Sequence, residues 1–247
     1  MAEGLEGAGS FIINQLVLVT STGLSVDLLT SVMGLTLYED IETSCITGTI
    51  MIQDSVNLAS FGPIIGQEYL HLKIRTPSLK GEESTIDFSK NVFIVNSLSS
   101  RQQLSRGTQG FVLSFVSQEL IKDQRTKVTQ SLTGTWSDIV KKMMVEYLKT
   151  KKSVRIENTS GVKKFVAPNV RPLDIIRMAK EQAVSNFKDE PTFLFYETLK
   201  GFNFRTLASL YNEKSVLNYN TVVPGSNVER GIINVERELQ TILAYEI

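Results

Sequence analysis

The chain has few of the residues that carry covalent or metal chemistry. It contains one cysteine, Cys45, and one histidine, His71, in 247 residues. A single cysteine excludes an internal disulfide and a metal site built from several cysteines. We therefore expect a protein of a reducing compartment, with Cys45 as a small half-buried strand residue rather than a nucleophile. His71 has no serine or cysteine motif beside it and is expected on the surface of a strand, not as a general base.

Long apolar runs and an excess of one charge are also absent. No apolar run approaches the ~20 residues that a membrane-spanning helix needs, so the sequence predicts no membrane insertion. The 26 basic residues equal the 26 acidic ones, whereas a nucleic-acid binder usually has a basic excess. Residues 1–10 are rich in Gly and Glu. They lack the basic and apolar regions of a secretory signal, and we expect a flexible tail.

Motifs for phosphate, dinucleotide or metal binding are missing too. No glycine-rich stretch is followed by the lysine and hydroxyl residue of a phosphate loop. Glu39, Asp40 and Glu42 lack the ligand spacing of a calcium loop, so a solvated turn is the expected structure. The sequence therefore predicts no catalytic residue, no metal site and no cofactor, and hence no enzyme.

The strands that are present gather in residues 11–76. Leu70, Leu72 and Ile74 alternate with polar side chains, which is the period of a strand with one buried and one wet face. Residues 92–95 and 111–116 continue the pattern, and the polar residues 99–108 between them predict a long hairpin loop. Short strands with frequent turns predict an antiparallel sandwich or small barrel over residues 11–127.

The pattern changes over residues 128–211, where we expect an α+β domain. Residues 137–149 have helical spacing, with Ser137 as N-cap and a solvated lysine run at 149, 151 and 152 as the helix end. Pro172 opens a second helix that runs to about residue 185. Strands are predicted at 154–156 and 164–166 around a turn at Gly161, then at 192–197 and from 201 onward.

Residues 212–247 return to strand-like character. A turn is predicted at Pro224-Gly225, and the final run 232–247 stays apolar to its last position. We expect a second β-domain that begins here and is not completed. The fold class is therefore mainly β with an inserted α+β domain, that is, an antiparallel barrel, the insertion and the start of a second barrel.

One turn is unusually apolar, Pro63-Ile64-Ile65-Gly66. Each exposed isoleucine forfeits about 1.5–3 kcal/mol of transfer free energy, so the turn needs burial. Two alternatives remain open from the sequence. The turn plugs the mouth of its own barrel, or it contacts the next subunit of an assembly.

Several motifs of the chain resemble those of a known protein family. The run LYEDIETSCITGTIMIQDSVNLASFGPIIGQEYLHLKIRTP resembles the opening domain of baseplate hub proteins from contractile-tailed bacteriophages. The shared residues in this run are Tyr38-Glu39-Asp40-Ile41, Thr47-Gly48, Asp54-Ser55, Pro63-Ile64-Ile65-Gly66, Glu68 and Leu70. Arg171-Pro172 and the run FLFYETLKGFNFRTLASL also resemble the family, so the likeness extends in order from about residue 11 to 211.

The resemblance implies a tail-tube-type β-barrel and a structural role in the virion. In that family two such barrels per subunit and three subunits make a pseudo-sixfold ring that joins the sixfold tail tube to the threefold central spike. The implied partners are further copies of the chain, the tail-tube protein or tube-initiator ring, the spike protein and the baseplate wedge proteins. Genome DNA passes through the lumen without sequence-specific binding, and assembly takes place in the host cytoplasm.

Two alternative functions, a binding module and an enzyme, belong to other classes of protein. A carbohydrate-binding or adhesin-type β-module of a phage tail requires a surface aromatic platform, but most phenylalanines here alternate with polar residues as core residues do. A tail hydrolase fused to a hub requires an acid/base pair, and none is visible in the sequence.

Overall fold

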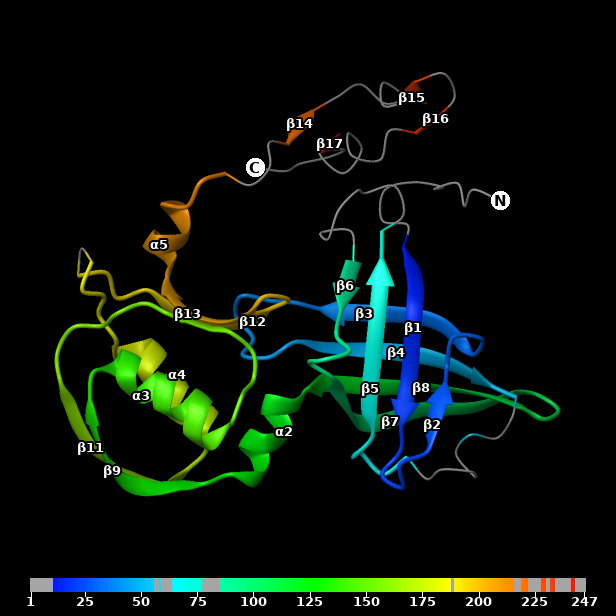
Figure 1. Ribbon diagram of the computed structural model, residues 1–247, viewed down its shortest axis with the longest axis horizontal. Helices are drawn as coiled ribbons and strands as arrows, with labels where there is room; N and C mark the ends of the chain where they lie inside the picture. Colours follow the sequence, from blue (N-terminus) through cyan, green and yellow to red (C-terminus); the bar gives the residue numbers. More distant parts are fainter. Residues whose placement is uncertain are drawn as a thin grey trace.

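The computed structural model describes residues 11–55, 58, 64–76, 85–187, 189–215, 219–221, 228–229, 232–233 and 241–242. The predicted tail at 1–10, Pro63 and the predicted turn at Pro224-Gly225 lie outside them. Most of the predicted second β-domain lies outside them as well. Figure 1 shows two lobes side by side, which we name the β-lobe (β1–β8) and the mixed lobe (α2–α5).

The β-lobe is one eight-stranded antiparallel sheet that folds into two layers. Its path of hydrogen-bonded neighbours runs β2-β1-β5-β7-β8-β4-β3, and β6 pairs with β5. In Figure 1 strands β1, β2, β5 and β6 run across strands β3, β4, β7 and β8. The strand bounds are Ile12–Val19 (β1), Ser25–Asp27 (β2), Val32–Tyr38 (β3), Thr47–Asp54 (β4), Tyr69–Arg75 (β5), Thr85–Asp87 (β6), Phe93–Ser105 (β7) and Thr108–Ser117 (β8).

An apolar core fills the space between these layers. Leu16, Leu70 and Leu113 have no exposed surface, and each comes from the alternating inward face of its strand. Gly48 leaves room for the two strands beside β4, because an added Cβ there would meet the Phe115 ring of β8 and the Thr36 carbonyl of β3. The alternation in the sequence therefore predicted this core, and the mainly antiparallel β fold is confirmed.

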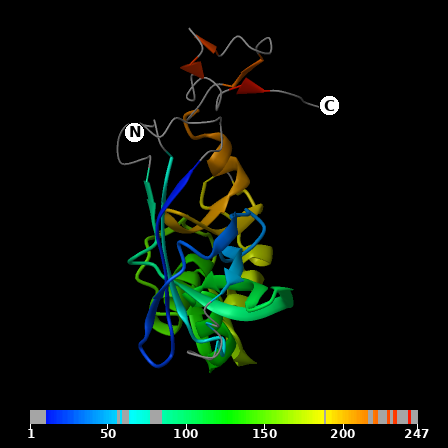
Figure 2. The same cartoon turned by 90° about the vertical axis from the view of Figure 1, so that its right-hand side faces the viewer.

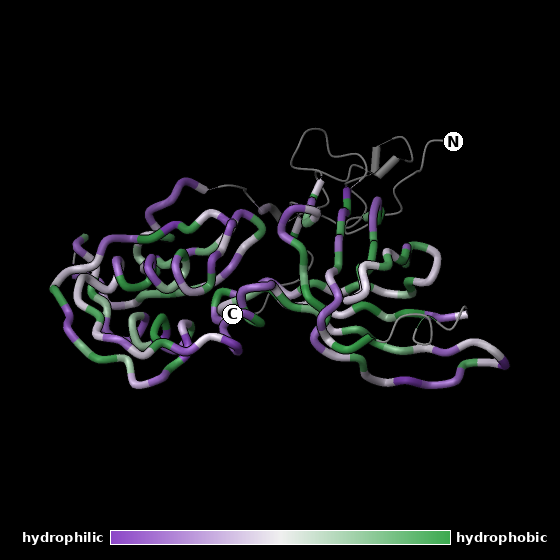
Figure 3. Tube along the Cα trace, turned by 60° about the horizontal axis from the view of Figure 1, so that its bottom comes forward, coloured by the Kyte–Doolittle hydropathy of each residue, from purple (hydrophilic) through white to green (hydrophobic). Residues whose placement is uncertain are grey.

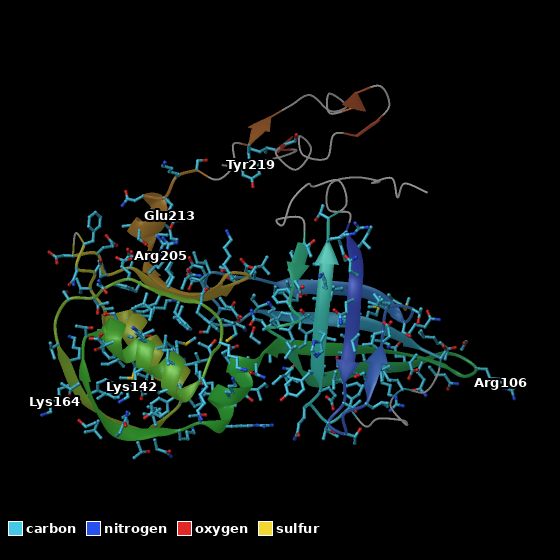
Figure 4. All side chains as sticks on the ribbon, in the orientation of Figure 1. Arg106, Lys142, Lys164, Arg205, Glu213 and Tyr219 are labelled. Carbon is cyan, nitrogen blue, oxygen red and sulfur yellow. The ribbon has the colours of Figure 1, made fainter. Side chains whose placement is uncertain are left out.

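The predicted hairpin loop at residues 99–108 is wrong. Strands β7 and β8 continue outward as a paired arm, with register shifts near Asn96, Ser100 and Leu104. Only Arg106 and Gly107 form the turn, and Figure 4 shows Arg106 at the tip of the arm, away from both lobes. The prediction failed because the arm pairs its own backbone and has no buried face to impose an apolar alternation.

The mixed lobe packs two helices between small sheets. Its elements are α2 (Gln118–Arg125), β9 (Val128–Gly134), α3 (Trp136–Lys142), the π-helix η2 (Met143–Tyr147), β10 (Val154–Ile156), β11 (Lys163–Val170), α4 (Pro172–Gln182), β12 (Phe193–Thr198), β13 (Gly201–Thr206) and α5 (Leu207–Tyr211). Strand β13 lies between β10 and β12, and β11 pairs with β9. Figure 3 shows hydrophobic stretches inside each of the two lobes.

Two sequence predictions in the mixed lobe need correction, whereas the strands expected at 154–156 and 164–166 on either side of Gly161 are present as β10 and β11. The two strands do not pair with each other, because β10 pairs in parallel with β13 and β11 pairs with β9. The first helix begins at Trp136 with Thr135 as N-cap, not Ser137, and Thr135 and Asp138 form a capping box. The helix that Pro172 opens ends at Gln182 rather than near residue 185.

Beyond α5 the described chain continues as short strands. Their bounds are Asn220–Thr221 (β14), Val228–Glu229 (β15), Ile232–Ile233 (β16) and Thr241–Ile242 (β17). Strand β14 pairs with β17 in parallel, and β15 pairs with β16 antiparallel. Figure 2 shows α5 rising from the mixed lobe toward these strands. No helix among the described residues is both long and apolar enough to cross a membrane.

Candidate functional site

The described part of the predicted apolar turn is held by a buried carboxylate. The Glu68 side chain accepts the backbone N–H groups of Ile65 at 2.7 Å, Gly66 at 3.0 Å and Gln67 at 3.1 Å. Glu68 has no exposed surface, so these three donors replace the water that its charge loses on burial. The turn needs a left-handed residue at Gly66, whose φ is +84°.

The two isoleucines of this turn point in different directions. Ile64 packs against the apolar core of the β-lobe, whereas Ile65 is 58 % exposed. Pro63 lies outside the described residues. The structure therefore packs one isoleucine against the core and leaves the other as an exposed apolar side chain, a division that the sequence did not reveal.

A buried network of charges lies where the two lobes meet. Lys152 Nζ lies 2.8 Å from Glu119 Oε2 on α2 and 2.5 Å from Glu197 Oε1 on β12. The three side chains are 8 %, 3 % and 2 % exposed. The lysine also lies over the Phe202 ring, 5.4 Å from its centroid. The prediction of a solvated lysine run is thus wrong at Lys152.

Every carboxylate oxygen of this network has a donor. Thr150 Oγ1 donates to Glu119 Oε1 at 2.7 Å, and the backbone N–H of Ile46 donates to Glu197 Oε2 at 2.9 Å. Ile46 belongs to the β-lobe and Glu197 to the mixed lobe, so the network ties the two lobes together. With one donor on each of the four oxygens, both buried carboxylates are held in a fixed orientation.

The pKa values of the network follow from this geometry. Burial alone raises the pKa of Glu119, but the Lys152 charge and the hydrogen bonds from Lys152 and Thr150 lower it below its ordinary value. Burial alone lowers the pKa of Lys152, but Glu197 and Glu119 together raise it. Both groups are therefore held in their charged forms.

The acidic loop after β3 also reaches the mixed lobe. The Glu39 carboxylate accepts the N–H of Leu199 at 3.3 Å, and Glu42 pairs with Lys180 on α4 at 2.9 Å. Asp40 stays local and accepts the N–H of Glu42 at 2.8 Å. The turn is exposed over residues 39–43, as the sequence predicts, and its two outer carboxylates also bind the mixed lobe.

Cys45 lies in the same junction. It is 4 % exposed and packs with the apolar core of the mixed lobe, in the loop before β4 rather than half-buried in a strand. Burial, followed by the Glu197 charge, raises its thiol pKa well above the ordinary value, so the thiolate nucleophile is disfavoured. His71 is half-buried on β5, opposite Val17 of β1.

A further ion cluster fixes the chain as it leaves the mixed lobe. Glu213 Oε1 lies 2.7 Å from Arg205 Nη1 and 2.9 Å from Arg155 Nη2. Figure 4 shows Arg205 and Glu213 beside α5. These partners come from β13, β10 and the residues after α5, and sequence spacing carries no signal for such a cluster.

No group of three or more His, Cys, Asp or Glu side chains among the described residues could hold a metal ion.

Comparison with solved structures identifies the fold. The 43 kDa tail protein of prophage MuSo2 from Shewanella oneidensis aligns with a TM-score of 0.54 at 10% identity, covering 87% of this chain and 59% of that one. A tail protein of Neisseria meningitidis aligns with a TM-score of 0.50 at 12% identity, covering 90% of this chain and 58% of that one. The Francisella PdpA-VgrG complex aligns with a TM-score of 0.50 at 12% identity, covering 89% and 33%.

The chain thus spans less than two thirds of the tail proteins that it matches. No protein-family model and no curated protein matches its sequence. The chain has the fold of phage tail proteins, and the fold that the resemblance implied is confirmed.

Proposed function

We propose that the chain is a structural protein of the virion, the baseplate hub that joins a sixfold tail tube to a threefold central spike. Three copies form a pseudo-sixfold ring on the tail axis. Its partners are the tail-tube protein or tube-initiator ring, the spike and the baseplate wedge proteins, and DNA passes through the lumen. The chain carries no catalysis, and assembly occurs in the host cytoplasm.

The observation that carries this proposal is the shared fold over 87% of the chain with a phage tail protein. A likeness over that share of the chain extends beyond the β-lobe, which ends at Ser117. The motifs that resemble baseplate hubs lie between about residues 11 and 211. Two independent signals, sequence motifs and three-dimensional fold, thus support one assignment.

The exposed isoleucine gives the proposal a local test. Ile65→Asp should leave the monomer folded and weaken trimer formation, because Ile65 is 58 % exposed yet ordered by Glu68. Ile64→Asp should instead unfold the β-lobe, because it places a charge against the apolar core. Val162→Asp, at a side chain that is 73 % exposed in the mixed lobe, is the matched control and should change neither property.

The measurements are far-ultraviolet circular dichroism for folding and mass photometry, with and without spike protein, for assembly. If Ile65→Asp assembles like the unmodified chain, the turn is not a subunit contact. An electron-microscopy reconstruction of the tail tests the whole proposal. Six identical copies of the chain, or a monomer away from the tail axis, would overturn it.

A further inference from the structure

A groove of about 460 Å³ in the mixed lobe lies between the helix α3–η2 and strand β10. Its helix wall is a single stripe, in which Ser137, Lys141 and Val145 follow one another at four-residue spacing. Its strand wall runs from Val154 to Asn158. Each of these two stretches is about 12–13 Å long at the rise of its own element, so the two walls match in length.

The two walls run side by side in opposite directions. At one end the backbone N–H of Ser137 donates to Thr159 Oγ1 at 2.9 Å, which holds the start of the helix beside the residues that follow β10. At the other end the short connection 148–153 joins the end of η2 to the start of β10. Val145 therefore lies toward Val154, and Lys141 lies toward the middle of the strand.

The free edge of β10 lies along this groove. Among the described strands β10 pairs with β13 alone, in parallel. The backbone carbonyl of Ser153 and the backbone N–H of Glu157 bond to β13 at 2.9 and 2.8 Å, and residue 155 between them faces the same way. The N–H and C=O groups of Val154 and Ile156 therefore point away from β13, and no described residue pairs with them.

Such an edge accepts the backbone of an added strand, which matches its unpaired N–H and C=O groups. The side chains of an added strand alternate between two faces, so every second one lies over the helix stripe. Helical positions four apart are separated by about 6 Å along the axis, and alternate strand residues by about 6.6–6.8 Å. One side chain of the strand therefore meets Val145, and the side chain two positions away meets Lys141.

These two helix positions define the chemistry of the partner. Val145 is 53 % exposed, and an apolar side chain covers it. Lys141 is exposed, and among the described ion pairs it is Lys142 that binds Glu146. The carboxylate of Asp138 is engaged in its capping box. We propose that the groove binds an extended segment of a partner protein, with an apolar and an acidic side chain two positions apart.

Two described strands of a second copy fit this groove less well. Strand β3, which pairs with β4 alone among the described strands, contains no acidic residue, and β10 itself carries Arg155. Neither strand places a carboxylate against Lys141, so the partner is a different protein. The groove is tested on the isolated chain. Failure of the peptide test therefore leaves the hub function standing, and failure of the hub function leaves the groove standing.

Hydrogen exchange of the full chain tests the docking. The probes are two blocked peptides, Thr-Thr-Val-Thr-Glu-Thr-Thr and Thr-Thr-Glu-Thr-Val-Thr-Thr, because an edge admits a parallel or an antiparallel strand. One of them at millimolar concentration should slow exchange severalfold at the amides of Val154 and Ile156. The amide of Arg155, which already faces β13, should keep its rate.

Two results of this experiment would overturn the proposal. The first is unchanged exchange at Val154 and Ile156 with both peptides. The second is exchange at these amides that slows as the protein concentration rises without peptide, because it would assign the edge to a second copy.

Three variants locate the contacts. Lys141→Glu should weaken binding of the preferred peptide severalfold and favour its analogue with lysine in place of glutamate. Lys164→Glu makes the same charge change at an exposed position of β11 and, as the matched control, should leave binding unchanged. Val154→Pro removes an N–H that the pairing with β13 does not use, so it should keep the fold and lose the protection of Ile156. If the proline variant unfolds, Lys141→Glu decides, and binding equal to that of the unmodified chain would overturn the proposal.

Discussion

Two of the regions with buried charge, the turn of the β-lobe and the junction between the lobes, use that charge differently. In the β-lobe the buried Glu68 binds backbone groups of its own turn, one to three residues away. At the junction Lys152 binds Glu119 and Glu197, which are 33 and 45 residues away. Glu197 also binds Ile46 across 151 residues. Local burial of charge fixes one turn, whereas long-range burial fixes how two lobes sit together.

The largest effect is expected from Lys152→Ala. Removing the cation leaves two carboxylates buried without compensation, and loss of one partner from a buried pair costs about 3–5 kcal/mol. The neighbouring exposed Lys151→Ala is the control and should change the free energy of unfolding by less than about 0.5 kcal/mol. Urea unfolding at neutral pH measures both. A loss below about 1 kcal/mol for Lys152→Ala would mean that water reaches the network.

Glu68→Gln should lower the free energy of unfolding by less than Lys152→Ala does, and it should loosen the turn of the β-lobe rather than the junction. The amide replaces one acceptor oxygen by a donor, so at least one N–H of the turn loses its acceptor, at a cost of about 1–3 kcal/mol. Hydrogen exchange should speed up at Ile65, Gly66 and Gln67 but not at Ile46. In Lys152→Ala the pattern should reverse, with faster exchange at Ile46. Faster exchange at the same amides in both variants would contradict the contrast between local and long-range anchors.

This contrast also explains what could be predicted from the sequence. Strand β5 was predictable because one of its faces meets a continuous apolar core, so Leu70, Leu72 and Ile74 alternate with polar residues. Pro172 marked the start of α4 because proline fits the first helical position. Lys152 was misread because a lysine run after a helix usually is solvated, and nothing near it in sequence indicates carboxylates on α2 and β12.

Strand pairing in the mixed lobe was unpredictable for a similar reason. Strands β10 and β11 are separated by a glycine turn, which favours a hairpin, yet each pairs with a distant strand. The split between Ile64 and Ile65 was likewise invisible, because it depends on Glu68 holding the turn. Local patterns specify an element's type, while long-range contacts decide its partner.

A smaller effect is expected at the first helix of the mixed lobe. Thr135→Ala removes the side chain that accepts the N–H of Asp138 at 3.2 Å in the capping box, which costs about 1 kcal/mol. Thr133→Ala, on the exposed side of β9, is the matched control and should be close to neutral. Thermal unfolding followed by circular dichroism compares the two. Equal melting temperatures would mean that another group caps the helix.

The smallest expected effect is a change in how stability depends on pH. The folded pKa of Glu119 is below its ordinary value of 4.5, so its contribution to stability is present above that value and is lost as pH falls through the folded pKa. The folded pKa of Lys152 is above its ordinary value of 10.5. Its contribution is therefore complete below that value and is lost as pH rises through the folded pKa.

The variant Glu119→Gln separates the loss of stability at low pH from the loss at high pH. The variant should lose less unfolding free energy than the unmodified chain as pH falls from about 5 to 3, because it has no carboxylate to protonate at position 119. The variant should still lose stability as pH rises through the folded pKa of Lys152, because Glu197 still pairs with Lys152. Asp123 opposes the acid trend, because burial raises its pKa and its protonation on folding favours the folded chain at low pH. An unchanged acid slope in the variant would show that Glu119 does not sense Lys152, and the network would then consist of the Lys152–Glu197 pair alone.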